Sequence, residues 1–208
     1  MVYESILLVG AGGHARSCID VIEQEGRYKI AGLIGLPSEV GQEVLGYSII
    51  GDDEDLPALL TTDMAVLITL GQIKTAALRV KMYEKLQKMC GNFPVIISPR
   101  AYVSPHAKIN NGTIVMHGAI INAGADIGHN CIINSNVLIE HDVVVSDHCH
   151  ISTASVLNGA VIVDRETFVG SGAHVRQSIK IGKRCIIGMG QSVVKNCLDD
   201  CKLFLVKG

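Results

Sequence analysis

The chain has 208 residues and 48% hydrophobic side chains, so one large domain or two small ones with an ample core are expected. The net charge of −2 and the absence of a lysine- and arginine-rich run argue against nucleic acid as a partner. No apolar run near the start is long enough for membrane insertion, and seven cysteines without paired spacing argue against a disulfide framework, so a cytoplasmic protein is expected.

Residues 1–95 are predicted to form an α/β domain of the Rossmann-like type. An apolar strand at 6–10, a glycine turn, a helix over 15–24 and a strand at 29–34 give a β-α-β start. A short helix ending at residue 60, a strand over 64–70 and a helix over 74–88 follow. The glycine turn favours an anion such as a diphosphate, but Gly35 and Leu36 stand where a nicotinamide-binding domain carries an acidic residue.

Residues 96–208 contain a repeat with a period of six. Stepping by six from Ile97, all seventeen positions are aliphatic: Ile97, Val103, Ile109, Val115, Ile121, Ile127, Ile133, Ile139, Val145, Ile151, Leu157, Val163, Val169, Val175, Ile181, Ile187 and Val193. Small or β-branched residues usually stand two positions earlier, and both sets point inward because side chains alternate along a strand. Each unit predicts a short strand and a corner, and three units predict one coil of an all-β parallel β-helix.

One corner of this repeat carries groups suited to acid–base chemistry. Ile139 and Val143 point inward, so Glu140, His141 and Asp142 are expected around the corner, with the imidazole facing outward. A carboxylate on one ring nitrogen fixes the tautomer and raises the basicity of the other. His141 is therefore a candidate general base, and a merely solvated polar corner is the alternative.

A second histidine-rich stretch, His148-Cys149-His150, raises two other possibilities. Histidines of adjacent subunits hold zinc in some hexapeptide-repeat proteins that act as carbonic anhydrases. Here Cys149 has the inward phase, which leaves His148 and His150 on the outer surface, and no metal is predicted. Cys149 as a nucleophile is disfavoured because an apolar setting raises the pKa of a thiol and blocks access to it.

Several motifs together resemble the bacterial sialic acid O-acetyltransferase family. They are the turn GAGGH at 10–14, Asn134, the Glu140-His141-Asp142 corner, His150 and the late glycine corners. The family includes enzymes that N-acetylate nucleotide-linked 4-amino sugars. The resemblance implies a left-handed β-helix, a homotrimer, and acetyl-CoA lying in the groove between two prisms.

The resemblance also assigns roles to individual residues. His141 would be the general base and Asp142 would increase its basicity. The substrate would contact Gly12, Gly13, His14, Gly71 and Asn134. Acetyl-CoA would contact His150, Gly159, Ser171 and Met189. The chain departs from the family at Gly35 and Leu36, where acidic residues commonly recognise the uridine end, and at 206–208, where relatives continue with a further turn and a basic tail.

The predicted function is acetyl transfer from acetyl-CoA to the amino group of a nucleotide-linked amino sugar in bacterial surface glycan biosynthesis. Three alternatives stay open at this point. The acceptor could be a hydroxyl of sialic acid or a related sugar, the chain could be a non-catalytic sugar-binding scaffold, or it could be a zinc carbonic anhydrase.

Overall fold

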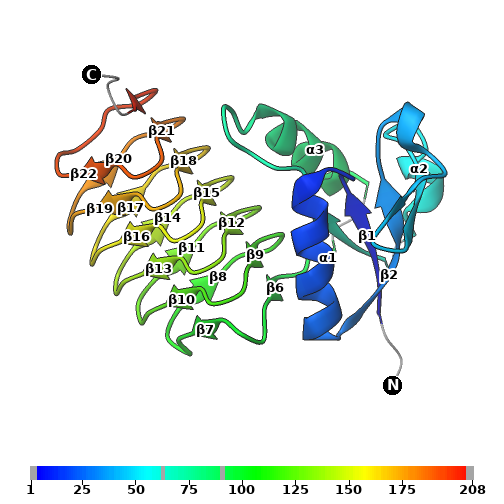
Figure 1. The fold of residues 1–208 in the computed structure, drawn as a ribbon, viewed down its shortest axis with the longest axis horizontal. Helices are drawn as coiled ribbons and strands as arrows, with labels where there is room; N and C mark the ends of the chain where they lie inside the picture. The colour runs from blue at the N-terminus through cyan, green and yellow to red at the C-terminus, as the bar shows by residue number, and fades with distance from the viewer. Residues whose placement is uncertain (1–3, 62–63, 90–91, 205–208) are drawn as a thin grey trace.

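The computed structural model describes residues 4–61, 64–89 and 92–204, which form a small α/β part beside a long prism (Figure 1). The α/β part has a five-stranded sheet in the order β3-β4-β2-β1-β5, parallel except for the β3–β4 hairpin. Its elements are β1 (Glu4–Val9), α1 (Gly13–Glu25), β2 (Tyr28–Ile34), the 3-10 turn η1 (Pro37–Glu39), β3 (Glu43–Val44), β4 (Tyr47–Gly51), α2 (Leu56–Leu59), β5 (Ala65–Ile68) and α3 (Ala77–Gln87). The β-α-β start is as predicted, whereas η1 and the hairpin lie where the sequence predicts no element.

The prism consists of strands of two residues each, separated by corners. They are β6 (Ile96–Ile97), β7 (Tyr102–Val103), β8 (Lys108–Ile109), β9 (Ile114–Val115), β10 (Ile120–Ile121), β11 (Asp126–Ile127), β12 (Ile132–Ile133), β13 (Leu138–Ile139), β14 (Val144–Val145), β15 (His150–Ile151), β16 (Val156–Leu157), β17 (Ile162–Val163), β18 (Phe168–Val169), β19 (His174–Val175), β20 (Lys180–Ile181), β21 (Ile186–Ile187), β22 (Ser192–Val193) and β23 (Lys202–Leu203).

These strands pair in parallel into three sheets, one for each side of the prism. The first sheet contains β7, β10, β13, β16, β19 and β22. The second contains β8, β11, β14, β17 and β20, and the third contains β6, β9, β12, β15, β18, β21 and β23. Partners such as Ile121 and Ile139 stand eighteen residues apart, which is one complete coil. The predicted fold, an α/β subdomain followed by a left-handed parallel β-helix, is confirmed.

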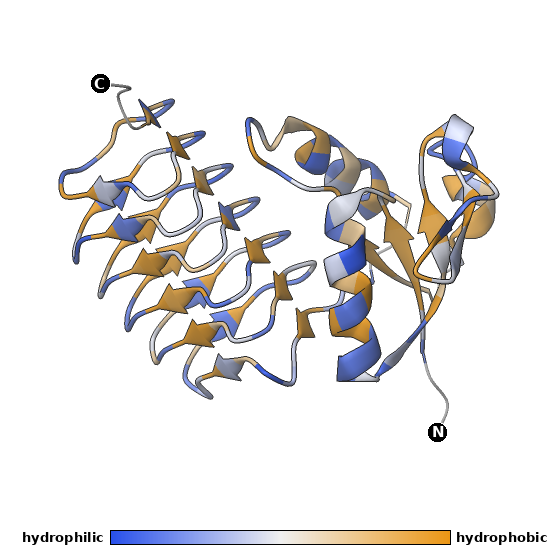
Figure 2. Cartoon of the chain, viewed as in Figure 1, coloured by the Kyte–Doolittle hydropathy of each residue, from blue (hydrophilic) through white to orange (hydrophobic). Residues whose placement is uncertain are grey.

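The interior of the prism is the predicted six-residue ladder. Fourteen of the seventeen aliphatic side chains form one buried apolar cluster with small inward residues such as Cys131 and Cys149, and the first three, Ile97, Val103 and Ile109, are partly buried and pack against it. In Figure 2 most prism strands are hydrophobic, and strands with a polar outward residue, such as β20, are partly hydrophilic. Each buried aliphatic side chain contributes about 1.5–3 kcal/mol, so the stacked coils are stabilised along their whole length.

The corners turn at a residue that the sequence does not single out. The left-handed residue lies three positions after the aliphatic one, as at Asn130, Asn136 and Asp142, with φ of 52°, 57° and 59°. Glu166 adopts the same conformation, although glutamate rarely does so. At each corner a backbone N–H donates to the preceding coil, as from Asp142 to the carbonyl of Ala123 at 3.2 Å. Stacking on the preceding coil therefore matters more here than residue type.

The last coil is shorter than the others. Ile187 pairs with Leu203, sixteen residues later, and Ile181 bridges to Cys197 over the same separation. The repeat of six is thus broken after Val193, where its next position is Asp199. The terminal stretch 206–208, one of the two predicted departures from the family, lies outside the described residues.

The α/β part covers the third sheet of the prism (Figure 1). The outward-facing side chains of Ile96, Ile114 and Ile132 are fully buried there and share one apolar cluster with residues of α1. The two parts therefore have a common core along this contact. Over the described residues, no helix combines the length and the apolar character that crossing a bilayer requires.

A buried arginine of α3 joins the two parts. One terminal nitrogen of Arg79 donates to the carbonyls of Ile68 and Leu70 at 2.9 and 2.6 Å. The other donates to the backbone oxygen and to Oδ1 of Asn130, at 3.1 and 2.6 Å. Burial lowers the pKa of Arg79 to about 10, so the guanidinium stays charged at neutral pH. The carboxyl end of β5 is thereby fixed relative to the prism.

Candidate functional site

Successive corners stack into three edges, and the predicted residues of the prism fall mainly on two of them. The edge between the first and second sheets, here called the His141 edge, carries His141, Asp142 and Gly159. The edge between the third and first sheets, the Asn134 edge, carries Asn134, Ser171 and Met189. The remaining edge is called the Asp164 edge and carries no predicted site residue.

His141 forms a hydrogen-bonded pair with Asp142. Its Nδ1 lies 2.9 Å from Oδ2 of Asp142, and both side chains are exposed, by 65% and 67%. A carboxylate oxygen can only accept here, so Nδ1 carries the hydrogen and Nε2 is left as a free acceptor facing solvent. Glu140, which was expected to flank the ring as well, accepts instead from Asn122 at 3.0 Å. One carboxylate rather than two orients the imidazole.

Glycines in the adjoining coils leave room for this pair. A Cβ atom at Gly159, in the following coil, would lie 2.6 Å from Nε2 of His141. In the same way, the carboxylate of Asp142 occupies the space that a Cβ atom would need at Gly124 in the preceding coil. The structure therefore places Gly159, which the resemblance assigned to acetyl-CoA, directly against the imidazole.

His150 is buried, contrary to the prediction that it lies on the outer surface. Its side chain points out of the third sheet, but the α/β part covers it and leaves it 7% exposed. Nδ1 donates to the carbonyl of Gln72 at 2.6 Å, so Nε2 is the acceptor for the Asn134 amide at 3.1 Å. Burial lowers the pKa of His150 to about 4. His150 is therefore neutral at pH 7, with a fixed tautomer.

His14 and Gly71 meet beside His150. The two imidazole centroids are 6.4 Å apart, and a Cβ atom at Gly71 would touch Cβ of His14 at 3.7 Å. Burial lowers the pKa of His14 to about 3. Among the described residues, neither Nε2 of His14 nor the side-chain amide of Gln72 has a hydrogen-bond partner, although these atoms are buried. Such atoms normally bind a ligand or water, and sequence reasoning did not identify Gln72.

The glycine turn after β1 borders an open pocket. Gly12 is the N-cap of α1 and supplies no side-chain cap, so the first N–H groups of the helix are available to a ligand. A Cβ atom at Gly12 or Gly13 would meet nothing within 4 Å. The adjoining pocket has a volume of about 300 Å³ and extends over the end of β2 to Leu36 and Leu78. The free N–H groups and the helix dipole favour a diphosphate at this turn.

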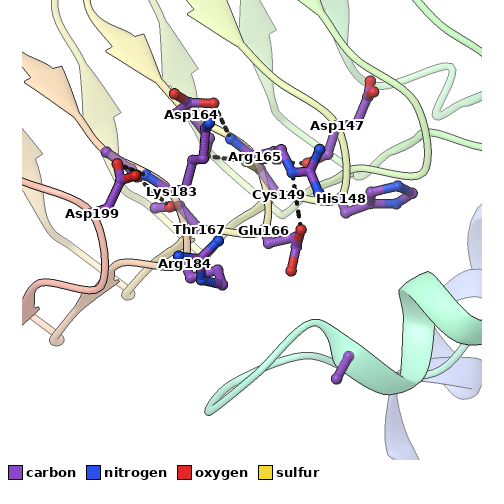
Figure 3. Close-up of polar contacts among 12 residues, drawn as sticks. Asp147, His148, Cys149, Asp164, Arg165, Glu166, Thr167, Lys183, Arg184 and Asp199 are labelled. Carbon is purple, nitrogen blue, oxygen red and sulfur yellow. Dashed lines mark hydrogen bonds and ion pairs between the residues drawn. The ribbon is translucent and has the colours of Figure 1, made fainter.

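The Asp164 edge carries charged residues that bond mainly to one another (Figure 3). Nε of Arg165 donates to Glu166 at 3.1 Å, and the backbone N–H of Lys183 donates to Asp199 at 2.9 Å. Exposed pairs of this kind contribute about 0–1 kcal/mol each. Beyond Asn130 and His148, which α3 covers, the described residues of this edge therefore form a surface of mixed charge without an orienting network like that of His141.

The stretch His148-Cys149-His150 divides between different environments. Nδ1 of His148 bonds to the Asn130 amide at 3.0 Å on the Asp164 edge. Cys149 is fully buried, its thiol donates to the carbonyl of Asp164 at 3.2 Å, and burial raises its pKa well above the ordinary value. Within the described ranges, no three His, Cys, Asp or Glu side chains are grouped to hold a metal ion. The thiol is thus unsuited to nucleophilic attack.

Within a single chain, the predicted site residues form two separate groups. His14, Gly71 and His150 converge near Asn134, where the α/β part meets the prism. His141 and Asp142 lie on another edge, with the first sheet between the two groups. A reaction that uses both groups requires the His141 edge of one chain to approach the Asn134 edge of another.

Both the α/β part and the prism resemble known proteins. A family model described as the PglD N-terminal domain matches residues 5–86, and no curated protein sequence matches. Perosamine N-acetyltransferase from Caulobacter crescentus, solved with CoA and GDP-perosamine, is 31% identical over 97% of this chain and 93% of its own, with a TM-score of 0.89. The acetyltransferase domain of PglB from Neisseria gonorrhoeae, solved with acetyl coenzyme A, is 26% identical over 97% and 96%, with a TM-score of 0.87. WeeI from Acinetobacter baumannii, at 19% identity over 95% of each chain and a TM-score of 0.81, shares the fold.

Proposed function

Because the chain belongs to the hexapeptide-repeat family of sugar acetyltransferases, we propose that it transfers the acetyl group of acetyl-CoA to the amino group of a nucleotide-linked amino sugar. The chain is an acetyl-CoA-dependent acyltransferase. The proposed acceptor is a precursor of a bacterial surface glycan, and the proposed location of the reaction is the cytoplasm. The observation that carries the proposal is the His141–Asp142 pair, in which the carboxylate holds Nδ1 of an exposed imidazole and Nε2 has no hydrogen-bond partner among the described residues. Two solved forms of the perosamine enzyme carry a substituted histidine, so an imidazole of that enzyme has also been probed.

The proposed chemistry is direct transfer. Nε2 of His141 accepts a proton from the sugar amine while the nitrogen bonds to the thioester carbonyl carbon. The carbon–sulfur bond then breaks, and the CoA sulfur leaves with a proton returned from the imidazolium. Asp142 stabilises that imidazolium because its carboxylate already accepts from Nδ1.

The Asn134 edge has features that suit the acetyl donor. Ser171 bonds to the hydroxyl of Ser152 at 2.9 Å, and Met189, one coil further along, is 71% exposed. His150 presents Nε2 as an acceptor to the Asn134 amide. With Gly159 on the facing edge of a neighbouring chain, these residues would line a cleft that admits the pantetheine arm.

We propose a homotrimer, as the resemblance implies. The main support is the separation of the two residue groups, which a neighbouring chain would bring together. A second support is the apolar surface of the first and second sheets, where Tyr102, Ile120, Val144 and Ile162 are 39–56% exposed. Apolar side chains exposed together on neighbouring strands are typical of subunit contacts.

Subunit mixing tests the proposal directly. His141→Ala and Asn134→Ala chains are each expected to lose about a hundredfold or more in kcat. When the two are co-expressed, about a quarter of the sites combine an intact His141 edge with an intact Asn134 edge, and activity returns to that extent. No recovery in mixed assemblies that are shown to form would contradict a site shared between chains.

The acceptor is tested by measuring CoA release with matched sugars that carry an amine or a hydroxyl at the same carbon. Acetylation of the amine alone is expected, whereas activity only on sialic acid would support O-acetylation. A His141→Ala chain that keeps every measurable function would support a sugar-binding scaffold. Stoichiometric zinc in the purified protein would favour the carbonic anhydrase alternative.

A further inference from the structure

The end of β2 carries a carboxylate that comes from a later position in the chain. In nucleotide-binding domains with this topology, an acidic residue after the second strand takes the ribose hydroxyls. Here Gly35 and Leu36 occupy that place, but η1 folds back and brings Glu39 to it. Oε2 of Glu39 accepts from the backbone N–H of Leu36 at 2.8 Å. The carboxylate missing from the strand end in sequence is therefore present there in space.

Gly35 is what makes this arrangement possible. A Cβ atom at residue 35 would lie 2.9 Å from Oε2 of Glu39, and equally close to Cγ2 of Ile49. Any larger residue would therefore press on the carboxylate. Gly35 leaves the space that the Glu39 carboxylate occupies. The carboxylate at the end of β2 therefore comes from position 39 rather than from positions 35 and 36, where the family commonly carries acidic residues.

Glu39 also borders the pocket of the glycine turn. The pocket of about 300 Å³ is lined by both Gly12 and Glu39, with Leu36, Leu70 and Leu78 among its apolar walls. While Oε2 is bonded to the backbone, Oε1 has no hydrogen-bond partner within the part of the chain that the structure describes. One carboxylate oxygen is thus available to a ligand that donates hydrogen bonds.

We propose that Glu39 binds the ribose hydroxyls of the nucleotide sugar and selects a ribonucleotide over its 2′-deoxy counterpart. This inference rests on the proposed function, because it assumes that the diphosphate lies at the N-terminus of α1. A carboxylate repels phosphate and can only accept hydrogen bonds, so the group beside it must be a donor. The 2′- and 3′-hydroxyls follow the phosphates along a nucleotide, and 2′-deoxyribose lacks one of these donors.

Calorimetric titration of the whole protein with UDP, GDP, dUDP and dGDP tests the proposal. The ribonucleotide that binds is expected to bind at least about tenfold more tightly than its deoxy form, because a hydrogen bond to a charged acceptor is lost. Glu39→Gln retains an acceptor for the Leu36 N–H, and its affinity for the ribonucleotide should fall to the deoxy level. Gly35→Ala should act in the same direction by displacing the carboxylate. Asp53→Asn, an exposed carboxylate that lines the same pocket, is the matched control and should keep the preference.

The outcomes separate this inference from the proposed function. Equal affinities of the wild-type protein for the ribo and deoxy forms would overturn the role of Glu39 and leave acetyl transfer intact. A preference that survives Glu39→Gln but disappears in Asp53→Asn would also overturn it. If neither nucleotide binds while a free amino sugar is acetylated, the nucleotide-linked substrate itself is refuted. The wild-type comparison decides the matter even if one variant fails to fold.

Discussion

Replacing Arg79 by methionine should destabilise the contact between the α/β part and the prism. The guanidinium makes four hydrogen bonds to neutral oxygens of Ile68, Leu70 and Asn130, at 2.6–3.1 Å, and its side chain is 1% exposed. Methionine fills much of the same volume but leaves those acceptors buried without donors. Four stranded acceptors cost about 1–3 kcal/mol each, and this cost is partly offset because no charged guanidinium has to be desolvated, so a net loss of about 3–5 kcal/mol in the free energy of unfolding is expected.

The assay is thermal unfolding at a fixed protein concentration. For a chain of this length, a loss of that size lowers the Tm by about 10 °C. Lys81→Met, an exposed substitution on the same helix, is the matched control and should shift the Tm by about 1 °C or less. Combining Arg79→Met with Asn130→Gly, which keeps the left-handed backbone, should cost less than the sum of the two single changes. A Tm for Arg79→Met equal to or above that of the wild type would refute the reasoning, because it would mean that desolvation of the charge outweighs its hydrogen bonds.

Three further predictions follow from the site and the ladder. Gly159→Ala should lower kcat at least about tenfold and leave the Tm unchanged, because the added Cβ atom displaces only the exposed His141 ring. An unchanged kcat would contradict the position of that ring. Because the folded pKa values of His14 and His150, about 3 and about 4, lie below the ordinary 6.5, the unfolded chain binds protons first, and stability is lost as the pH falls from 6.5 towards 4. Urea unfolding between pH 7 and 5 should show a slope that approaches about 1.4 kcal/mol per pH unit for each histidine below about pH 6, and a His14→Gln, His150→Gln double variant should lose this slope. Leu157→Asp places a charge in the buried ladder and should abolish folding, as circular dichroism would show. Ile162→Asp, at a side chain that is 40% exposed, should keep the fold and weaken only the assembly of subunits, as sedimentation would show. A folded Leu157→Asp protein would argue against the ladder as the source of stability.

The β-helix could be predicted because its information is local and repeated. Seventeen aliphatic positions at a spacing of six fix the inward face of every strand without reference to any distant residue. The corners were less predictable, since residues as different as Asn136 and Glu166 adopt the same left-handed conformation. Bonds to the preceding coil impose that conformation, so residue type is a weak signal there.

The candidate site was predictable only where the repeat determines it. The outward projection of His141 follows from the inward phase of Ile139 and Val143, and the structure agrees. The burial of His150 depends on the carbonyl of Gln72, 78 positions earlier in the chain, and a periodic pattern holds no information about such a contact. The carboxylate at the end of β2 was missed for the same reason, because η1 has to fold back to supply it.

The eighteen-residue coil constrains how such a protein can gain or lose residues. Deleting a whole coil of eighteen residues shortens the prism but leaves every later residue on the same edge as before. Deleting six residues preserves the inward ladder yet rotates everything beyond the cut by one side, so a cut between His141 and Gly159 would move Gly159 to a different edge from His141. Length changes in this domain are therefore tolerated by the fold in steps of six, but by the chemistry only in steps of eighteen.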